Sequence, residues 1–118
     1  MKHYIRTENS HKRGFTHFFS DISSEDLSNQ VHNCLISNGY KLKEGTSGNG
    51  IYEKGSYIVR ILLGAFYKYF KWTVQTDKSE LESLIKIESK TSGMSGGLIG
   101  VNQVKKETKN LFNELMSL

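Results

Sequence analysis

With 118 residues, the chain is long enough to bury a core without a metal or a disulfide, and its one cysteine, Cys34, excludes an internal disulfide. The net charge of +4 is too small to predict a polyanion partner by itself, and no apolar run reaches the roughly 20 residues of a membrane span. We therefore expect a cytoplasmic protein without a membrane-spanning segment.

Residues 1–14 are polar and basic, with Lys2, Arg6, Lys12 and Arg13 set against Glu8. They lack the apolar core of a signal peptide, and we expect a loose N-terminal arm. The remaining residues, 15–118, are predicted to form a single α+β domain. Residues 14–20 are short and aromatic, which favours a first strand.

The first helix is indicated by a hydroxyl followed by acids, Ser24-Glu25-Asp26, where the helix dipole favours negative charge. Apolar residues then recur with the spacing of one helical face, at Leu27, Val31, Cys34 and Leu35. Asn38-Gly39 is typical of a helix end. The pattern predicts an amphipathic helix over residues 24–38.

Two short strands are expected next, at residues 40–43 and 51–53, on either side of a glycine-rich loop at 45–50. Lys54-Gly55 is interpreted as either a tight turn or a bulge within one long strand.

Residues 55–76 hold the longest apolar runs and most of the aromatic residues, and they predict a central hairpin that bends at Gly64-Ala65. In its second half, Phe66, Phe70, Trp72 and Val74 alternate with polar positions. Such a strand has one face on the core and one in water. Trp72 is expected to be buried with Phe70, Val74, Leu35 and Leu111.

A turn is expected at residues 77–79 and a strand at 81–89, in which Ile85 and Ile87 face away from Lys86 and Glu88. Residues 90–100 read as a glycine-serine loop. A last helix is predicted over residues 98–116, with an apolar stripe at Leu98, Val101, Val104, Leu111, Phe112, Leu115 and Met116 and with Thr108 as its weak point.

This order, β-α-β4/5-α, predicts a single curved antiparallel sheet of about five to six strands with two helices packed on one face. The order resembles that of TATA-box-binding-protein-like half-domains and of the helix-grip family of lipid-binding domains. The resemblance is one of topology, and it implies little about function.

One candidate binding surface is the outward face of the sheet, which would carry Arg60, Tyr67, Tyr69, Lys71 and Lys86. Aromatic rings between cations can stack bases and bind phosphates. The alternative interpretation is an ordinary solvated sheet face, where tyrosine and lysine are good cross-strand neighbours.

A second candidate is the loop that contains Ser95, Gly96 and Gly97, because glycines before a helix can expose backbone amides to an anion. No Lys-Ser or Lys-Thr pair follows as in a P-loop. We therefore favour a structural connector that lets the last helix fold back.

The sequence contains no metal-ligating spacing among its histidines and no nucleophile–base arrangement, so we expect no cofactor, no metal and no enzyme. The preferred hypothesis is a small binding module for an apolar or amphipathic ligand or for a protein. The alternative is a nucleic-acid-binding module that uses the basic, tyrosine-rich sheet face and the basic N-terminal arm.

Overall fold

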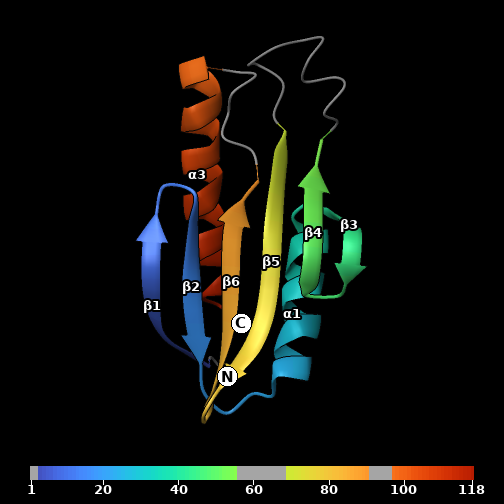
Figure 1. Cartoon of the computed structure of the whole chain (residues 1–118), viewed down its shortest axis with the longest axis vertical. Coiled ribbons are helices and arrows are strands. Elements are labelled where there is room, and N and C mark those ends of the chain that lie inside the picture. The colour runs from blue at the N-terminus through green and yellow to red at the C-terminus, as the bar shows by residue number, and fades with distance from the viewer. Residues whose placement is uncertain (1–2, 56–68, 91–96) are drawn as a thin grey trace.

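The computed structural model describes residues 3–55, 69–90 and 97–118, which form one antiparallel sheet and two helices (Figure 1). The expected α+β class is therefore confirmed. In chain order, the elements are β1 (Tyr4–His11), β2 (Gly14–Phe19), α1 (Ser24–Ser37), β3 (Lys41–Thr46), β4 (Asn49–Lys54), β5 (Phe70–Ser79), β6 (Glu82–Ser89) and α3 (Gly97–Leu115).

The six strands pair in the order β1-β2-β6-β5-β4-β3, and each neighbouring pair is antiparallel. The chain starts at one edge of the sheet, passes through α1 to β3 at the opposite edge, and returns strand by strand until β6 pairs with β2 (Figure 1). Both helices contribute to the same hydrophobic core as the inner side chains of the strands, so they cover one face of the sheet.

The N-terminal segment differs from the sequence prediction. A loose arm was predicted for residues 1–14, but Tyr4–His11 forms the edge strand β1 and pairs with β2. Its attachment is polar, because the Arg6 guanidinium donates to both carboxylate oxygens of Glu82 at 2.6 and 3.1 Å and lies 4.1 Å from the centre of the Phe18 ring. Within residues 3–55, 69–90 and 97–118 the order of elements is therefore β-β-α-β-β-β-β-α, and β1 is a strand that the predicted order β-α-β4/5-α lacked.

The predicted glycine-rich loop at residues 45–50 is also wrong, because β3 and β4 extend into it and leave only Ser47 and Gly48 as a turn. Glycine makes this pairing possible, since a Cβ on Gly50 would lie 1.9 Å from the backbone oxygen of Glu44. Two strands can approach this closely only where a side chain is missing.

The hairpin turn between β5 and β6 lies at Glu80 and Leu81 rather than at the predicted residues 77–79. Ser79 pairs with Glu82 across it, and Glu80 adopts a φ of 54°. Leu81 is 93% exposed at its tip. The polar residues before Glu80 therefore continue β5 instead of ending it.

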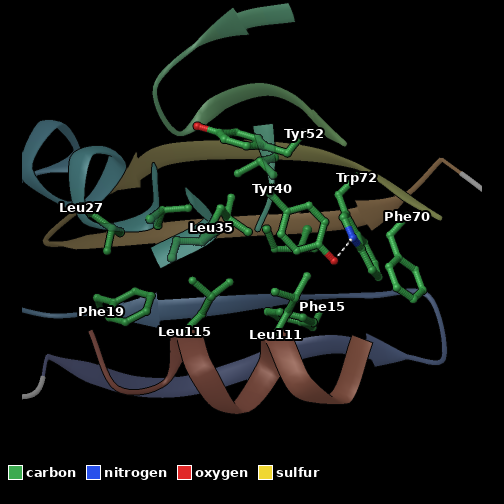
Figure 2. Packing of buried hydrophobic residues seen from close by; sticks show 14 of the residues in the cluster. Phe15, Phe19, Leu27, Leu35, Tyr40, Tyr52, Phe70, Trp72, Leu111 and Leu115 are labelled. Atoms are coloured by element: carbon green, nitrogen blue, oxygen red, sulfur yellow. Dashed lines mark hydrogen bonds between the residues drawn. The ribbon is translucent and has the colours of Figure 1, made fainter. Parts of the chain in front are cut away.

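The alternation predicted for the central strands is confirmed where the structure describes it. Phe70, Trp72 and Val74 of β5 and Ile85 and Ile87 of β6 are buried, while Lys86 between the two isoleucines is exposed. These side chains pack against both helices in the core shown in Figure 2. The larger set of core residues there includes Phe15, Phe19, Leu27, Leu35, Tyr40, Tyr52, Leu111 and Leu115.

The two helices agree closely with their predicted bounds. The Ser23 hydroxyl accepts from the Asp26 amide at 3.0 Å and caps α1, and Gly39 follows the helix with a φ of 91°. In α3, the stripe of Val104, Leu111 and Leu115 is buried, as expected. Three other expectations lie outside the described residues: the first strand of the central hairpin, its bend at residues 64–65, and most of the loop at 90–100.

The first testable expectation concerns Trp72, which is fully buried and is expected to carry a large part of the free energy of unfolding. Trp72→Ala should lower that free energy by about 3–5 kcal/mol, since it leaves a cavity and removes many contacts. Urea denaturation monitored by circular dichroism measures the change. The exposed Leu81→Ala is the control and should stay within about 0.5 kcal/mol of wild type. Equal midpoints for both variants would contradict the described core.

Candidate ligand-binding site

Helix α3 divides its surface between the core and two flanks. Val104, Thr108, Leu111 and Leu115 are buried and recur with the spacing of one helical face. Thr108 fits among apolar neighbours because its hydroxyl donates to the carbonyl of Val104 at 2.7 Å. Each flank of this buried stripe borders a cavity, so α3 contributes residues to both candidate binding sites.

The first cavity lies between α3 and the turn that joins β1 to β2, and we call it the hairpin groove. Its volume is about 390 Å³, which lies in the range of roughly 300–1,000 Å³ typical of small-molecule sites. The residues that line it are Ser10, His11, Lys12, Lys105, Thr108, Lys109, Phe112 and Asn113.

Phe112 is the only Phe, Tyr or Trp among the described residues that line this groove, and its ring can form a floor. Its ring is half-buried and meets Phe15 and His17 edge-on, with ring centres 5.3 and 4.6 Å apart. Edge-to-face contacts of this kind favour a fixed orientation of the rings. One face of α3 is thereby held firmly against β2 directly beneath the groove.

His17 makes this attachment specific. Its side chain is fully buried, with Nε2 2.8 Å from the carbonyl oxygen of Phe112 and Nδ1 2.8 Å from the Thr7 hydroxyl. The carbonyl can only accept, so Nε2 carries the proton and Nδ1 accepts from Thr7, which in turn accepts from Tyr4 at 2.6 Å. Burial lowers the pKa of His17, and the neutral ring satisfies both nitrogens.

The opening of the hairpin groove is positively charged. Lys12, Lys105 and Lys109 are exposed around it, and none of them forms an ion pair with any residue described by the structure. His11 is the remaining titratable residue of the lining, and its Nε2 lies 3.3 Å from a carboxylate oxygen of Glu88. The groove therefore combines an aromatic floor with a cationic rim.

The second cavity lies on the other flank of α3, has a volume of about 340 Å³, and is called here the polar cavity. Its lining residues are Lys54, Phe70, Gln103, Lys106, Glu107 and Asn110. They include charges of both signs and two amides, in contrast to the hairpin groove.

A buried hydrogen-bond chain lies behind the polar cavity. Trp72 Nε1 donates to the Tyr40 hydroxyl at 2.9 Å (Figure 2), and that hydroxyl donates to Glu107 Oε2 at 2.5 Å. Lys54 Nζ lies 3.8 Å from the same oxygen. Burial, followed by the hydrogen bond to Glu107 and the negative charge of Glu107, raises the pKa of Tyr40 well above its usual range. Tyr40 therefore remains a neutral donor, and the chain connects sheet to helix rather than supplying a reactive group.

The residues predicted for the sheet face do not form one exposed surface within the described part of the chain. Tyr69 is only 5% exposed, and its hydroxyl donates to Glu53 at 2.5 Å, which corrects its expected role as an exposed stacking ring. Lys71 pairs across the sheet with Glu53, and Lys86 is exposed on β6. Arg60 and Tyr67 lie outside the described residues.

The loop candidates Ser95 and Gly96 also lie outside the described residues. Gly97 is the first residue of α3. The choice between connector and anion site at this loop stays a prediction.

The hairpin groove was missed by the sequence analysis, although one signal for it exists. Lys105, Lys109 and Phe112 follow one another at i, i+4 and i+7, which aligns them on one flank of a helix. Their partner Lys12 was assigned to a loose arm, so the two halves of the groove were never brought together.

The described part of the chain holds neither a metal site nor a membrane-spanning helix. In the described ranges 3–55, 69–90 and 97–118, no three His, Cys, Asp or Glu side chains come together as a metal site. Neither of the helices in these ranges has the length and apolar character needed to cross a membrane. The sequence matches no protein-family model and no curated protein, and the fold matches no solved structure.

The buried His17 predicts how stability depends on pH. Its lowered pKa means that the unfolded chain takes up this proton at higher pH than the folded chain. The contribution of neutral His17 is therefore complete above about pH 6.5 and is lost as the pH falls below that value, with a slope of at most about 1.4 kcal/mol per pH unit.

Urea midpoints of wild type and His17→Gln, measured between pH 7.5 and 5, test this dependence. Below pH 6.5 the wild type should lose stability more steeply than His17→Gln, because only the wild type has a buried imidazole that must take up a proton. Parallel curves for wild type and His17→Gln would show that His17 is not held neutral.

The hydrogen-bond chain predicts coupling between β3, which begins just after Tyr40, and α3. Tyr40→Phe should lower the free energy of unfolding by about 1–3 kcal/mol, because it removes a partner from both Trp72 and Glu107. A double-mutant cycle with Glu107→Gln should give a coupling energy above about 0.5 kcal/mol. Strict additivity of the two changes would contradict a direct Tyr40–Glu107 interaction.

Proposed function

We propose that this chain is a non-enzymatic binding module that holds a small amphipathic ligand in the hairpin groove. The proposal is based on one observation: in this groove the aromatic ring of Phe112 lies beside a rim of polar and cationic side chains. Binding sites for small molecules are mostly apolar with a few convergent polar groups, and the hairpin groove has this composition.

The rigidity of the groove supports the proposal. Phe112 is fixed by its edge-on contacts with Phe15 and His17, and its own carbonyl is held by His17. A floor that is already ordered loses little conformational entropy when a ligand binds, so more of the contact energy appears as affinity.

A finer architecture belongs to the same proposal. Strands β2-β6-β5-β4-β3 with α1 and α3 would form a helix-grip-like or TATA-box-binding-protein-like unit, with β1 added at its edge. Helix-grip domains hold ligands between the sheet and a long helix. Here Leu111 and Leu115 of α3 are fully buried in the core between helix and sheet, which favours a ligand at the flank of α3 instead. We also propose a cytoplasmic location, on the basis of the single cysteine.

The absence of an available base within the groove supports binding rather than catalysis. Ser10 and His11 are the nearest approach to a nucleophile and a base in its lining. Both nitrogens of His11 are engaged, because Nε2 faces Glu88 at 3.3 Å and Nδ1 accepts from the amide of Arg13 at 3.2 Å. A general base needs a nitrogen directed at the proton that it removes.

The second candidate function, nucleic-acid binding on the sheet face, has weaker support. On three neighbouring strands the face presents Lys41, Glu53 and Lys71 in one cross-strand row, so charges of opposite sign alternate there. A nucleic-acid surface requires an excess of positive charge along the path of the phosphates.

Binding of a neutral apolar dye, N-phenyl-1-naphthylamine, tests the proposed function. The dye should bind saturably to the wild-type protein with enhanced fluorescence. Asn113→Trp should weaken binding by about tenfold or more, because the indole would fill the groove from its exposed lining without removing a core residue.

The matched control is Asn33→Trp, which places the same side chain on the exposed surface of α1, away from the groove. It should leave dye binding unchanged. If the wild type does not bind the dye, or if both variants bind it like wild type, the hairpin groove is not a ligand site.

A further inference from the structure

We infer that the ligand of the hairpin groove is a single-chain amphiphile with an anionic head, a carboxylate or a phosphate, bound by Lys12, Lys105 and Lys109. This inference rests on the function proposed above and adds the chemical class of the ligand. It depends on how charge is distributed around α3 and the β1–β2 turn.

The three lysines come from two separate parts of the chain and meet at one opening. Lys105 and Lys109 lie one turn apart on the same flank of α3, and Lys12 lies in the turn of the β1–β2 hairpin. Like charges brought together in this way repel one another, so the free protein is destabilised slightly and an anion between them is favoured.

Negative charge is kept out of the groove. Among the described residues that line it, none is acidic. Glu107, on the opposite flank of α3, is engaged with Tyr40 and Lys54. Glu88 borders the groove through His11, whose Nε2 lies 3.3 Å from its carboxylate, and it forms no ion pair with the three lysines. The positive charge of the three lysines is therefore left for a ligand.

The residues at the floor of the hairpin groove indicate that the rest of the ligand is apolar. Phe112 offers an aromatic surface, and the buried Thr108 has its hydroxyl turned to the Val104 carbonyl, so it offers no donor to a ligand. An apolar chain lying on this floor would place its head at the rim. Lysine ammonium groups are compact point charges that bind carboxylate and phosphate alike, so these lysines do not select between the two heads.

Four amphiphiles with the same twelve-carbon tail separate the contribution of the head from that of the tail. Dodecanoate, dodecyl phosphate, dodecanol and dodecyltrimethylammonium, each below its micelle concentration, are titrated against the dye-loaded protein. The two anions should displace the dye at concentrations about tenfold or more below dodecanol, and the cation should be the weakest.

The double variant Lys105→Gln with Lys109→Gln should lose most of this preference, measured as the ratio of its affinities for dodecanoate and dodecanol. Lys106→Gln is the matched control, because it removes the same charge from the same helix on the flank of the polar cavity. It should keep the preference for anions. The preference of the wild type should also weaken as salt rises.

The possible results separate the inference from the function on which it rests. If none of the four amphiphiles binds, both fail. If all four bind alike, or if the double variant keeps its preference for anions, the groove remains a ligand site and the anionic head is excluded. Loss of the preference in Lys106→Gln as well would attribute it to overall charge and would also overturn the inference.

Discussion

The arrangement of the groove depends on one buried side chain, that of His17. It lies on β2 between two neighbours, the Thr7 hydroxyl of β1 and the Phe112 carbonyl of α3. Either neighbour alone would fix one nitrogen of the ring, whereas the two together fix its orientation and its tautomer. Strands β1 and β2 and helix α3 are therefore all connected through His17 inside the core, and the groove lies where these three elements meet.

One side-chain hydrogen bond on each flank of α3 fixes the position of the helix on the sheet. On one flank His17 binds a helix carbonyl, and on the other Tyr40 binds the side chain of Glu107. Apolar packing is largely non-directional, and the leucines of the buried stripe would tolerate small shifts of the helix along the sheet. A hydrogen bond tolerates only a few tenths of an ångström, so these two contacts determine the register of α3 and with it the shape of both cavities.

The sequence predicted the parts of the fold whose patterns are local. The capped α1, the alternation around Trp72 and the stripe of α3 all follow from spacing within a short segment. Strand β1 was missed because its side chains carry no apolar alternation. Arg6 is attached through the Phe18 ring and the distant carboxylate of Glu82, and Thr7 through His17, so polar contacts stand in place of apolar ones.

The same reason explains why the groove escaped prediction. The residues of α3 that line the groove could be recognised from the spacing of Lys105, Lys109 and Phe112. The other residues that line it lie at the end of β1 and in the β1–β2 turn, and they reach α3 only because β1 is a strand paired with β2. The turn between β5 and β6 was misplaced for a related reason, since Asp77 to Ser79 have the composition of a turn yet continue β5 by pairing with β6. Pairing between strands decides such cases, and composition does not record it.

The position of β6 between β5 and β2 has a consequence for how the chain folds. The hairpins β1–β2, β3–β4 and β5–β6 each join segments that follow one another closely, so they can form early. The pairing of Phe15 with Ile87 joins distant parts of the chain, and the entropy of closing that loop must be overcome before its contacts are gained. Docking of the first hairpin onto the completed β3–β6 meander is thus the natural rate-limiting event, on the order of milliseconds to seconds for chains rich in non-local pairing.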